Sequence, residues 1–597
     1  MKRVFYQCRH LCIALVSLSV SVSLVGCPAD AAFVRPTRSK QGMVVSAHPL
    51  ASEAGLSMLR KGGNAVDAAV ATTFAISVVE PFSAGIGGGG FLLLHWTPTK
   101  ETKALDFRER APQLASRDMY LDETGKVRQN ASINGHLSAA VPGTVAGLYE
   151  VQRRYGKLSW QEVVAPSIQL ARDGFIVGDR FVQTFSDRKE AILSNPAARQ
   201  VFTNNGIPYV RGERLVQQDL ARTLKAIAKN PQNFYTGNIA SAIARDMALN
   251  RGLITLQDLK AYKPTWREPL CGRFRQYRIC SMPPPSSGGV HLLQILNIIG
   301  DGTGTVSLRS LGWHNPDALH LMIEAMRIAY ADRSQYLGDP AFVNVPVQAL
   351  TSPGYAALRR QEISMQQARL SSQVKPVDWQ TLRRFSSEDP SKIPSASPTP
   401  STKESSDTSH LTVVDAQRNT VSLTFTVNYG FGSGVVVPGT GILLNDEMDD
   451  FAAAPGVPNV FGLVGGDANA IAPNKIPLSS MTPTIVTENG RLRLATGSPG
   501  GSTIITTVLQ VILNVLEYDM DAGAAVSAGR LHHQWLPDAL RVDKWGFDPT
   551  TLADLQRRGH KIEVQPGWGN ANAIVQTPDG LLEGAADPRG EGAAVGF

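Results

Sequence analysis

The sequence contains little cysteine, which limits the metal and redox chemistry open to the protein. Only five of its 597 residues are cysteine, and none lies with histidine at the spacing of a metal site, so we expect no bound metal. Cys271 and Cys280 are the two that lie inside the body of the chain. An oxidising compartment would favour a disulfide between them, but one regular strand would hold them too far apart. A disulfide and two free thiols therefore both stay open.

Charged residues are also few, at 18% of the chain, and the formal net charge is only +7. The first 26 residues contain Lys2, Arg3 and Arg9 but no acid, so a chain that begins at Cys27 carries +4. A charge this small and scattered argues against a nucleic-acid partner.

The chain lacks the signatures of nucleotide cofactors. The glycine-rich residues 85–90 have neither the Lys-Ser/Thr ending of a phosphate-binding loop nor the spacing of a dinucleotide site. We interpret them as a tight turn before a strand over residues 91–95, and we expect no cofactor.

The N-terminus carries an apolar segment over residues 11–25 that follows three basic residues. This is the pattern of an export signal over residues 1–26. Leu24-Val25-Gly26-Cys27 resembles the lipobox of bacterial lipoproteins, in which Cys27 takes the lipid; ordinary cleavage after Ala29-Asp30-Ala31 is the alternative. We expect export to the periplasm, or an outer-membrane lipoprotein of a Gram-negative bacterium, in which the lipid anchors the chain to a membrane surface.

A polar segment divides the chain. Residues 385–406 are crowded with Ser, Pro, Lys, Asp and Glu, and they hold almost no apolar side chain that could offset the entropy lost on ordering. A strand-like run begins directly after this segment. A cut between Asp407 and Thr408 would create an N-terminal threonine that carries both a nucleophilic hydroxyl and its own basic amine. The alternative is a loop that leads into an ordinary edge strand.

The residues after Thr408 predict a hairpin that brings a second hydroxyl to it. Residues 420–428 alternate apolar and polar side chains, which predicts a half-buried strand with one polar face. If Asp415 and Asn419 pair across a three-residue loop, Thr408 lies opposite Thr426. A two-residue loop would shift the register by one and turn Thr426 away.

Two further signals concern helices. Gly500 and Gly501 precede an apolar helical run over residues 504–516, and backbone N–H groups at such a start can hold an oxyanion. A plain chain reversal is the alternative there. Ser159 and Glu162 form a capping box, and the helix that it opens should end near Gly174.

Taken in order, the motifs carry a family resemblance. Over nearly the whole mature chain, the sequence resembles the bacterial γ-glutamyltranspeptidases (γ-glutamyltransferases, glutathione hydrolases), which are N-terminal nucleophile hydrolases. The motifs that carry it are Gly62-Gly63-Asn64-Ala65-Val66-Asp67-Ala68-Ala69, Asp106-Phe107-Arg108-Glu109, Ser281-Met282-Pro283-Pro284-Pro285-Ser286-Ser287-Gly288-Gly289, Gly338-Asp339-Pro340, Pro477-Leu478-Ser479-Ser480-Met481 and Gly497-Ser498-Pro499-Gly500-Gly501.

The resemblance implies an α+β fold, the four-layer αββα sandwich of this superfamily. Composition agrees, because 43% hydrophobic residues are enough for an ample core. One chain would cut itself into two fragments that stay together as a heterodimer and one composite folded unit. The large subunit would cover residues 27–407, with its Ser- and Pro-rich tail at about 385–407, and the small catalytic subunit would cover residues 408–597.

The resemblance also assigns roles to individual residues. Thr408 would be the self-generated nucleophile, Thr426 would hydrogen-bond it, and Gly500 and Gly501 would form the oxyanion hole. Arg108 would grip the α-carboxylate of a γ-glutamyl group, a task that suits the fork of a guanidinium. The remaining pocket residues would be Asn428, Glu447, Asp450, Ser479 and Ser480, with the carboxylates opposite the α-amino group and the serines near the carboxylate.

Several of these residues have simpler interpretations. Arg108 alone could form a surface ion pair with Asp106 or Glu109, and residues 447–450 alone resemble a solvated acidic loop. Glu447 stands where some family members have glutamine. His410 lies on the same strand face as Thr408, but we expect a structural role for it, because the amine of Thr408 would supply the base.

The implied reaction passes through a γ-glutamyl ester on Thr408. Glutathione and other γ-glutamyl compounds would be donors, and amino acids, peptides or water would be acceptors. The chain would first cut itself between Asp407 and Thr408. The alternatives are an acylase of the same superfamily that removes a glutaryl group from a β-lactam nucleus, and a non-catalytic lipoprotein that binds γ-glutamyl compounds.

Overall fold

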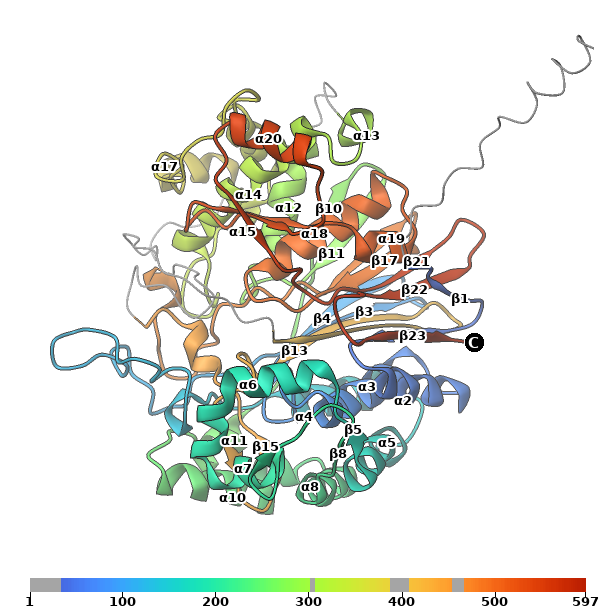
Figure 1. Cartoon of the computed structure of the whole chain (residues 1–597), viewed down its shortest axis with the longest axis vertical. Helices are drawn as coiled ribbons and strands as arrows, with labels where there is room; N and C mark the ends of the chain where they lie inside the picture. Colours follow the sequence, from blue (N-terminus) through green and yellow to red (C-terminus); the bar gives the residue numbers. More distant parts are fainter. Residues whose placement is uncertain (1–33, 301–306, 387–406, 454–465) are drawn as a thin grey trace, which may run out of the picture. The chain divides into compact units, whose positions relative to one another are not determined.

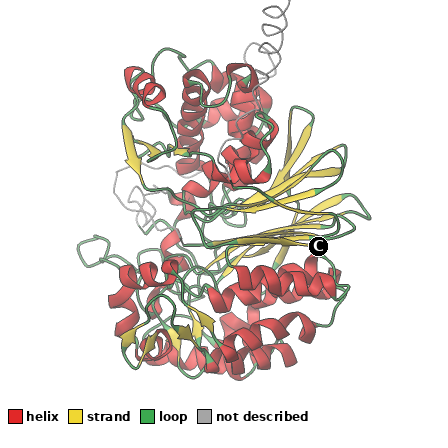
Figure 2. Cartoon of the chain, turned by 45° about the vertical axis from the view of Figure 1, so that its right-hand side comes forward, coloured by secondary structure: helices red, strands yellow, loops and turns green. Residues whose placement is uncertain are grey.

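Two seven-stranded sheets, stacked on each other, form the centre of the protein (Figures 1 and 2). The computed structural model describes residues 34–300, 307–386, 407–453 and 466–597. The expected export signal with Cys27, and nearly all of the Ser- and Pro-rich tail, lie outside the described residues. Residues Arg35–Phe597 form one unit. Among the described residues, no helix has the length and apolar character that crossing a bilayer requires.

Sheet I contains the predicted hairpin. In spatial order its strands are β23 (Ala593–Gly596), β2 (Met43–Ser46), β12 (Ser409–Val414), β13 (Thr420–Thr426), β3 (Gly89–Trp96), β4 (Glu101–Phe107) and β9 (Thr265–Arg267). Sheet II consists of β1 (Thr37–Ser39), β22 (Leu582–Ala586), β21 (Asn572–Gln576), β17 (Arg491–Gly497), β16 (Thr484–Glu488), β11 (Tyr277–Ser281) and β10 (Leu270–Phe274). Every neighbouring pair in both sheets is antiparallel.

Helices cover the outer face of each sheet. Sheet I is covered by α2 (Pro49–Arg60), α3 (Ala65–Val79) and α4 (Thr144–Tyr155), with α5 (Trp160–Asp173) and α8 (Gln218–Lys229) packed behind them. Sheet II is covered by α12 (Gly288–Gly300), α18 (Thr503–Leu516) and α19 (Ala522–Ser527), with α14 (Pro316–Tyr336) packed on α12. The order helix, sheet, sheet, helix confirms the predicted four-layer sandwich (Figure 2).

The remaining elements complete the fold. The other helices are α6 (Asp179–Ser194), α7 (Pro196–Phe202), α9 (Asn233–Thr236), α10 (Asn238–Leu249), α11 (Leu256–Ala261), α13 (Leu308–Leu311), α15 (Val347–Leu350), α16 (Pro353–Arg360), α17 (Trp379–Leu382) and α20 (Pro549–Arg557). The small sheets are formed by β5 (Phe175–Ile176), β6 (Thr203–Asn204), β7 (Ile207–Pro208), β8 (Arg214–Leu215), β14 (Val436–Val437), β15 (Ile442–Leu443), β18 (Leu531–His532), β19 (Leu540–Asp543) and β20 (Ile562–Gln565). Helix α5 begins after its Ser159 cap and ends at Gly174, as the capping box predicts.

The central strands are buried on both faces, which explains their sequences. In β3, Leu92 and Leu94 pack toward the helices over sheet I, while Phe91 and Leu93 belong to the core that includes sheet II. Strand β13 alternates in the same way, but its polar face is not solvated, because all its residues are buried. The prediction of a half-buried strand was therefore wrong. Its polar face meets the second sheet instead of water, so Ser422 donates to the Thr496 carbonyl oxygen at 3.0 Å.

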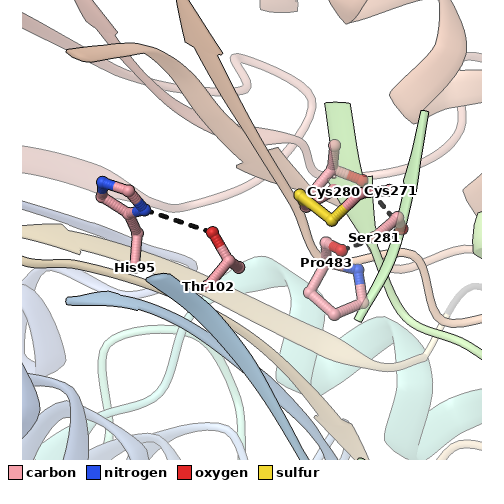
Figure 3. The surroundings of a disulfide bond; sticks show 7 residues. His95, Thr102, Cys271, Cys280, Ser281 and Pro483 are labelled. Carbon is pink, nitrogen blue, oxygen red and sulfur yellow. Dashed lines mark hydrogen bonds between the residues drawn. A yellow bond between two sulfur atoms is a disulfide. The ribbon is translucent and has the colours of Figure 1, made fainter. Parts of the chain in front are cut away.

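Cys271 and Cys280 form a disulfide (Figure 3). They lie opposite each other on β10 and β11, with their Cα atoms 4.1 Å apart. The objection to a disulfide assumed one strand between them, whereas the chain turns back between Phe274 and Tyr277. The hairpin therefore decides between the two alternatives that the sequence left open.

Candidate active site

Thr408 lies at the start of β12, where the hairpin brings it to Thr426. The amide of Asp415 donates to the Asn419 carbonyl oxygen at 3.1 Å, which closes the predicted three-residue loop. From there the register runs to Ser409 opposite Phe425. The Thr408 and Thr426 hydroxyl oxygens are 3.2 Å apart, so the predicted register is confirmed.

The hydroxyl of Thr426 connects Thr408 to the bond that would be cut. It donates to the carbonyl oxygen of Asp407 at 3.3 Å and accepts the backbone N–H of Asn428 at 2.8 Å. Because its one proton points to Asp407, the Thr408 hydroxyl is the donor between the two threonines. The Thr408 hydroxyl, the Thr426 hydroxyl and the Asp407 carbonyl thus form one hydrogen-bonded chain.

Gly500 and Gly501 form the turn between β17 and α18. Both have positive φ, 131° and 54°, which favours glycine at these positions. Gly501 lines the pocket next to Thr408. Within the described part of the chain, neither glycine N–H has a hydrogen-bond acceptor. The turn can therefore offer two backbone donors near Thr408.

Arg108 follows β4 and is buried, with 1% of its surface exposed. Its guanidinium contacts three carboxylates, Glu109 at 3.2 Å and the closer Glu447 and Asp450. Burial would lower the pKa of this guanidinium, but the carboxylates, Glu447 first, raise it overall. The interpretation as a surface ion pair was therefore wrong, and the Asp106 carboxylate pairs instead with Arg267 at 2.8 Å.

The acidic side of the pocket is a buried 3-10 helix, Glu447–Asp450, rather than a solvated loop. Burial raises the pKa of Glu447 well above its usual value, and the neighbouring Glu109 and Asp450 charges raise it further. Burial also raises the pKa of Glu109. One guanidinium faces three carboxylates, so the Glu109 and Glu447 pair is expected to hold a proton near neutral pH. The sequence analysis had assigned Glu109 no role in the pocket.

Two serines form another part of the wall. The Ser479 carbonyl oxygen accepts hydrogen bonds from the backbone N–H and the hydroxyl of Ser287, both at 2.8 Å. Arg333 of α14 donates to the Ser480 hydroxyl at 3.4 Å, and burial lowers the pKa of Arg333 to about 10. No motif includes Arg333, which lies within α14 just before Gly338-Asp339-Pro340, so its sequence position gave no sign of a role in the pocket. Ser286 and Ser287 belong to one of the family motifs, but the sequence suggested no role for them.

A single pocket of about 330 Å³, measured to its open mouth, brings nearly all the predicted residues together. Its walls come from both sides of the Asp407–Thr408 bond. The lining residues are Arg108, Thr408, Thr426, Asn428, Glu447, Asp450, Leu478, Ser479, Ser480, Met481, Gly501 and Ile504. Of the predicted pocket residues, Gly500 alone is not in the wall, although it adjoins Gly501.

His410 is buried below the threonine pair and is held by its neighbours. Its ring nitrogens lie 2.8 Å from the Thr424 hydroxyl and 3.0 Å from the Thr412 hydroxyl. Burial lowers the pKa of His410 to about 3, so the ring is neutral. These contacts agree with the expected structural role. The described residues contain no group of three or more side chains suited to hold a metal ion.

Comparisons with known proteins agree with this pocket. The family model described as gamma-glutamyltranspeptidase matches residues 51–597. The chain is 47% identical to a glutathione hydrolase proenzyme of Escherichia coli, over 93% of this chain and 91% of that protein.

Acylases are also similar to the chain. It is 38% identical to an acylase ACY 1 proenzyme of a Pseudomonas species, over 94% of each chain. The crystal structure of a cephalosporin acylase from Bacillus halodurans is 29% identical, with a TM-score of 0.80 over 96% of this chain and 99% of that one. Because the family model and the E. coli relative each cover over nine-tenths of the sequence, the chain belongs to the γ-glutamyltranspeptidase family.

Proposed function

We propose that the protein is a γ-glutamyltransferase and glutathione hydrolase that activates itself by cutting the Asp407–Thr408 bond. One observation carries this proposal: the Thr408 hydroxyl shares a pocket with the buried Arg108 guanidinium, the buried Glu447 carboxylate and the partly buried Asp450 carboxylate. A free γ-glutamyl end is a zwitterion, with an α-carboxylate and an α-ammonium a few ångströms apart. The pocket offers opposite charges to both, beside a nucleophile.

Self-cutting would use the hydrogen-bonded chain around Thr426. The Thr408 oxygen attacks the Asp407 carbonyl carbon, and the peptide nitrogen leaves as the acyl group moves from nitrogen to oxygen. Thr426 supports this step, because its hydroxyl polarises the Asp407 carbonyl at 3.3 Å and accepts from Thr408. Water then hydrolyses the ester, which leaves the Asp407 carboxylate and a free amine on Thr408. Residues 27–407 and 408–597 become the large and small subunits of a heterodimer.

In turnover, the new amine is the base. It takes the proton of the Thr408 hydroxyl as that oxygen attacks the γ-carbonyl carbon of the donor, and it passes the proton to the leaving amine. The developing oxyanion would be held by the N–H groups of Gly500 and Gly501. The γ-glutamyl ester that results on Thr408 is resolved by water in hydrolysis, or by the amine of an amino acid or peptide in transfer.

Binding of the donor would exchange partners within the pocket. Arg108 takes the α-carboxylate, with Ser479 and Ser480 beside it, and Asp450 and Glu447 take the α-ammonium. Asn428 is fixed near the threonines, since its side-chain amide donates to the Asp446 carbonyl oxygen at 3.1 Å. Because Arg108 already contacts three carboxylates, the incoming carboxylate is accepted only if the ammonium arrives with it to neutralise the acids.

This requirement separates the proposal from acylase activity. A glutaryl group has no α-ammonium, so it would leave Glu447 and Asp450 facing an added negative charge. The similarity to acylases nevertheless makes a glutaryl substrate the necessary control. We expect cleavage of γ-glutamyl-p-nitroanilide and little cleavage of glutaryl-p-nitroanilide; the reverse preference would assign the pocket to acylase chemistry.

The decisive experiment is intact mass measurement with N-terminal sequencing, on the unchanged protein and a Thr408→Ala variant prepared in parallel. Two fragments, the smaller starting at Thr408 and absent from the variant, are the expected result. One uncut chain in both samples would overturn the mechanism, because no free amine would form. A non-catalytic binding protein would then be the better explanation.

The proposal also covers where the mature protein is found in the cell. We infer export, with Cys27 as the lipid attachment residue, from the sequence of the N-terminal segment. Radiolabelled palmitate should enter the unchanged protein and not a Cys27→Ser variant. If neither protein takes up the label and both are still secreted, cleavage after Ala31 would be favoured instead.

A further inference from the structure

A second opening lies at one edge of the sandwich, where the chain crosses from sheet I to sheet II. Strand β9 ends sheet I and β10 ends sheet II, and residues 268–269 join them. The edge cleft between these strands has an open volume of about 1510 Å³. It is lined by Lys100, Glu101, Thr102, Lys103, Arg154, Tyr155, Trp266, Arg267, Glu268, Pro269, Leu270, Cys271 and Arg278.

Cations outnumber acids in this edge cleft. Five lysine and arginine side chains line it, against Glu101 and Glu268. Some are neutralised locally, since Lys103 lies 2.9 Å from Glu101 and Arg267 lies 2.8 Å from the buried Asp106. Within the described residues, neither Arg278 nor Lys100 forms an ion pair. Burial lowers the pKa of His95, and the Arg278 charge lowers it further, so Arg278 lies close enough to act on this ring.

The disulfide opens onto the same edge cleft. Gly272 and Ile279 face α12, where a Cβ on Gly272 would meet Leu293, so the alternate residues Cys271 and Cys280 face sheet I. Figure 3 shows the disulfide with His95 and Thr102 of sheet I, joined at 3.1 Å, across from it. Cys271 is partly exposed in the cleft wall, whereas Cys280 is 2% exposed. Of the two cysteines, Cys271 is therefore the one that an incoming group can approach from the cleft.

We propose that the edge cleft is a thiol–disulfide exchange site, at which a small anionic thiol such as glutathione becomes attached to Cys271. The thiolate sulfur bonds to the Cys271 sulfur, and the electron pair of the broken disulfide goes to the Cys280 sulfur. That thiolate takes up the proton that the incoming thiol released. The product is a mixed disulfide at Cys271 and a buried thiol at Cys280.

Charge and burial decide which thiol reacts and how long the product lasts. Glutathione carries two carboxylates and one ammonium, and its thiolate adds a further negative charge that the cleft cations attract. The buried Cys280 thiol stays opposite Cys271 on the hairpin, so it can attack back and expel the thiol. The fraction of protein that carries the mixed disulfide therefore rises with the concentration of the thiol in the surrounding solution. Glutathione as the natural thiol rests on the proposed function; the charge selectivity does not.

The test traps the product in an uncut Thr408→Ala background, where no donor is consumed. In a Cys280→Ser variant, Cys271 keeps a thiol that can attack an added disulfide but has no partner to reverse the step. We expect glutathione disulfide, an anion, to modify this variant at least severalfold faster than cystamine, a cation, as measured by intact mass. An added Arg278→Glu substitution should reduce or reverse that preference.

Two controls keep the test decisive. A matched Cys271→Ser variant retains only the buried Cys280 of this pair, and position 280 should react slowly with both reagents. The native disulfide, with no cysteine changed, should be reduced faster by 2-mercaptoethanesulfonate than by cysteamine, as measured by alkylation of the released thiols. Equal rates for anionic and cationic reagents, or equal reaction of the two cysteine variants, would overturn the proposal. None of these readouts requires the enzyme to be active.

Discussion

The active-site pocket and the edge cleft both contain arginine and acidic side chains, but they use charge differently. In the pocket, Arg108 is 1% exposed and its guanidinium is enclosed by three carboxylates. In the cleft, Arg278 is exposed and makes no ion pair with any described residue. Buried charges interact strongly and are costly to leave unpaired, whereas exposed charges are screened by water and salt. The pocket should therefore select a ligand whose positive and negative groups pair with the charges of the pocket. The cleft should select only by the net charge of the ligand.

The largest effect is expected from Arg108→Ala. Removing one partner of a buried charge cluster costs about 3–5 kcal/mol, so turnover of a γ-glutamyl anilide should fall by a factor of about a hundred or more. Self-cutting should continue, because it uses Thr408 and Thr426. Arg108→Lys keeps the charge but loses the forked guanidinium, so its turnover should lie between that of Arg108→Ala and that of the unchanged protein. A variant that turns over normally would show that the pocket cation does not bind the donor.

A smaller effect is expected from Thr426→Ala, which removes the hydroxyl between Thr408 and Asp407. One lost hydrogen bond to a reacting group is worth about 1–3 kcal/mol, so self-cutting and turnover should both slow by roughly tenfold to a hundredfold. Thr426→Ser keeps the hydroxyl and should restore most of both rates. The rate of appearance of the small fragment and anilide release measure the two steps. Unchanged rates in Thr426→Ala would sink the assigned role.

The acidic side of the pocket can be tested through stability. The native pKa of Glu109 is raised from 4.5 to about 7, and that of Glu447 is raised too. The folded protein therefore holds a proton that the unfolded chain releases. Its contribution to the free energy of unfolding is fully present below pH 4.5 and is lost as pH rises toward 7. Glu447→Gln should flatten the fall of Tm over this range, measured in the Thr408→Ala background. The same Tm slope in both proteins would contradict a shared proton.

The smallest effects are expected at the edge cleft. Arg278→Ala should change the free energy of unfolding by less than about 0.5 kcal/mol and leave anilide turnover unaltered. Added salt should reduce the preference of Cys271 for anionic reagents, since the screening length falls from about 10 Å at 0.1 M to about 3 Å at 1 M. If salt had no influence on that preference, the selectivity would not come from the exposed cations, and the contrast with the pocket would fail.

Local sequence was enough to predict the hairpin that carries the nucleophile. Loop length and a period of two specify the register of antiparallel strands, so residues 408–426 narrow the pairing to a few registers. The three-residue loop of the structure selects the register that pairs Thr408 with Thr426. The capping box of α5 and the glycine turn before α18 are equally local. The surroundings of strand β13 could not be predicted locally. Alternation alone does not tell whether a polar face meets water or, as in β13, a second sheet.

The sequence by itself determined the family motifs, the proposed cutting point and the residue types of the pocket, because these depend on neighbours in the chain. Only the tertiary structure decided that Cys271 and Cys280 pair, that Arg108 is enclosed by Glu109, Glu447 and Asp450, and that Arg333 reaches Ser480. Apart from the neighbours Arg108 and Glu109 and the hairpin pair Cys271 and Cys280, these contacts join residues that lie far apart in the chain. Burial and charge balance arise only when strands and helices pack, so no local pattern contains them.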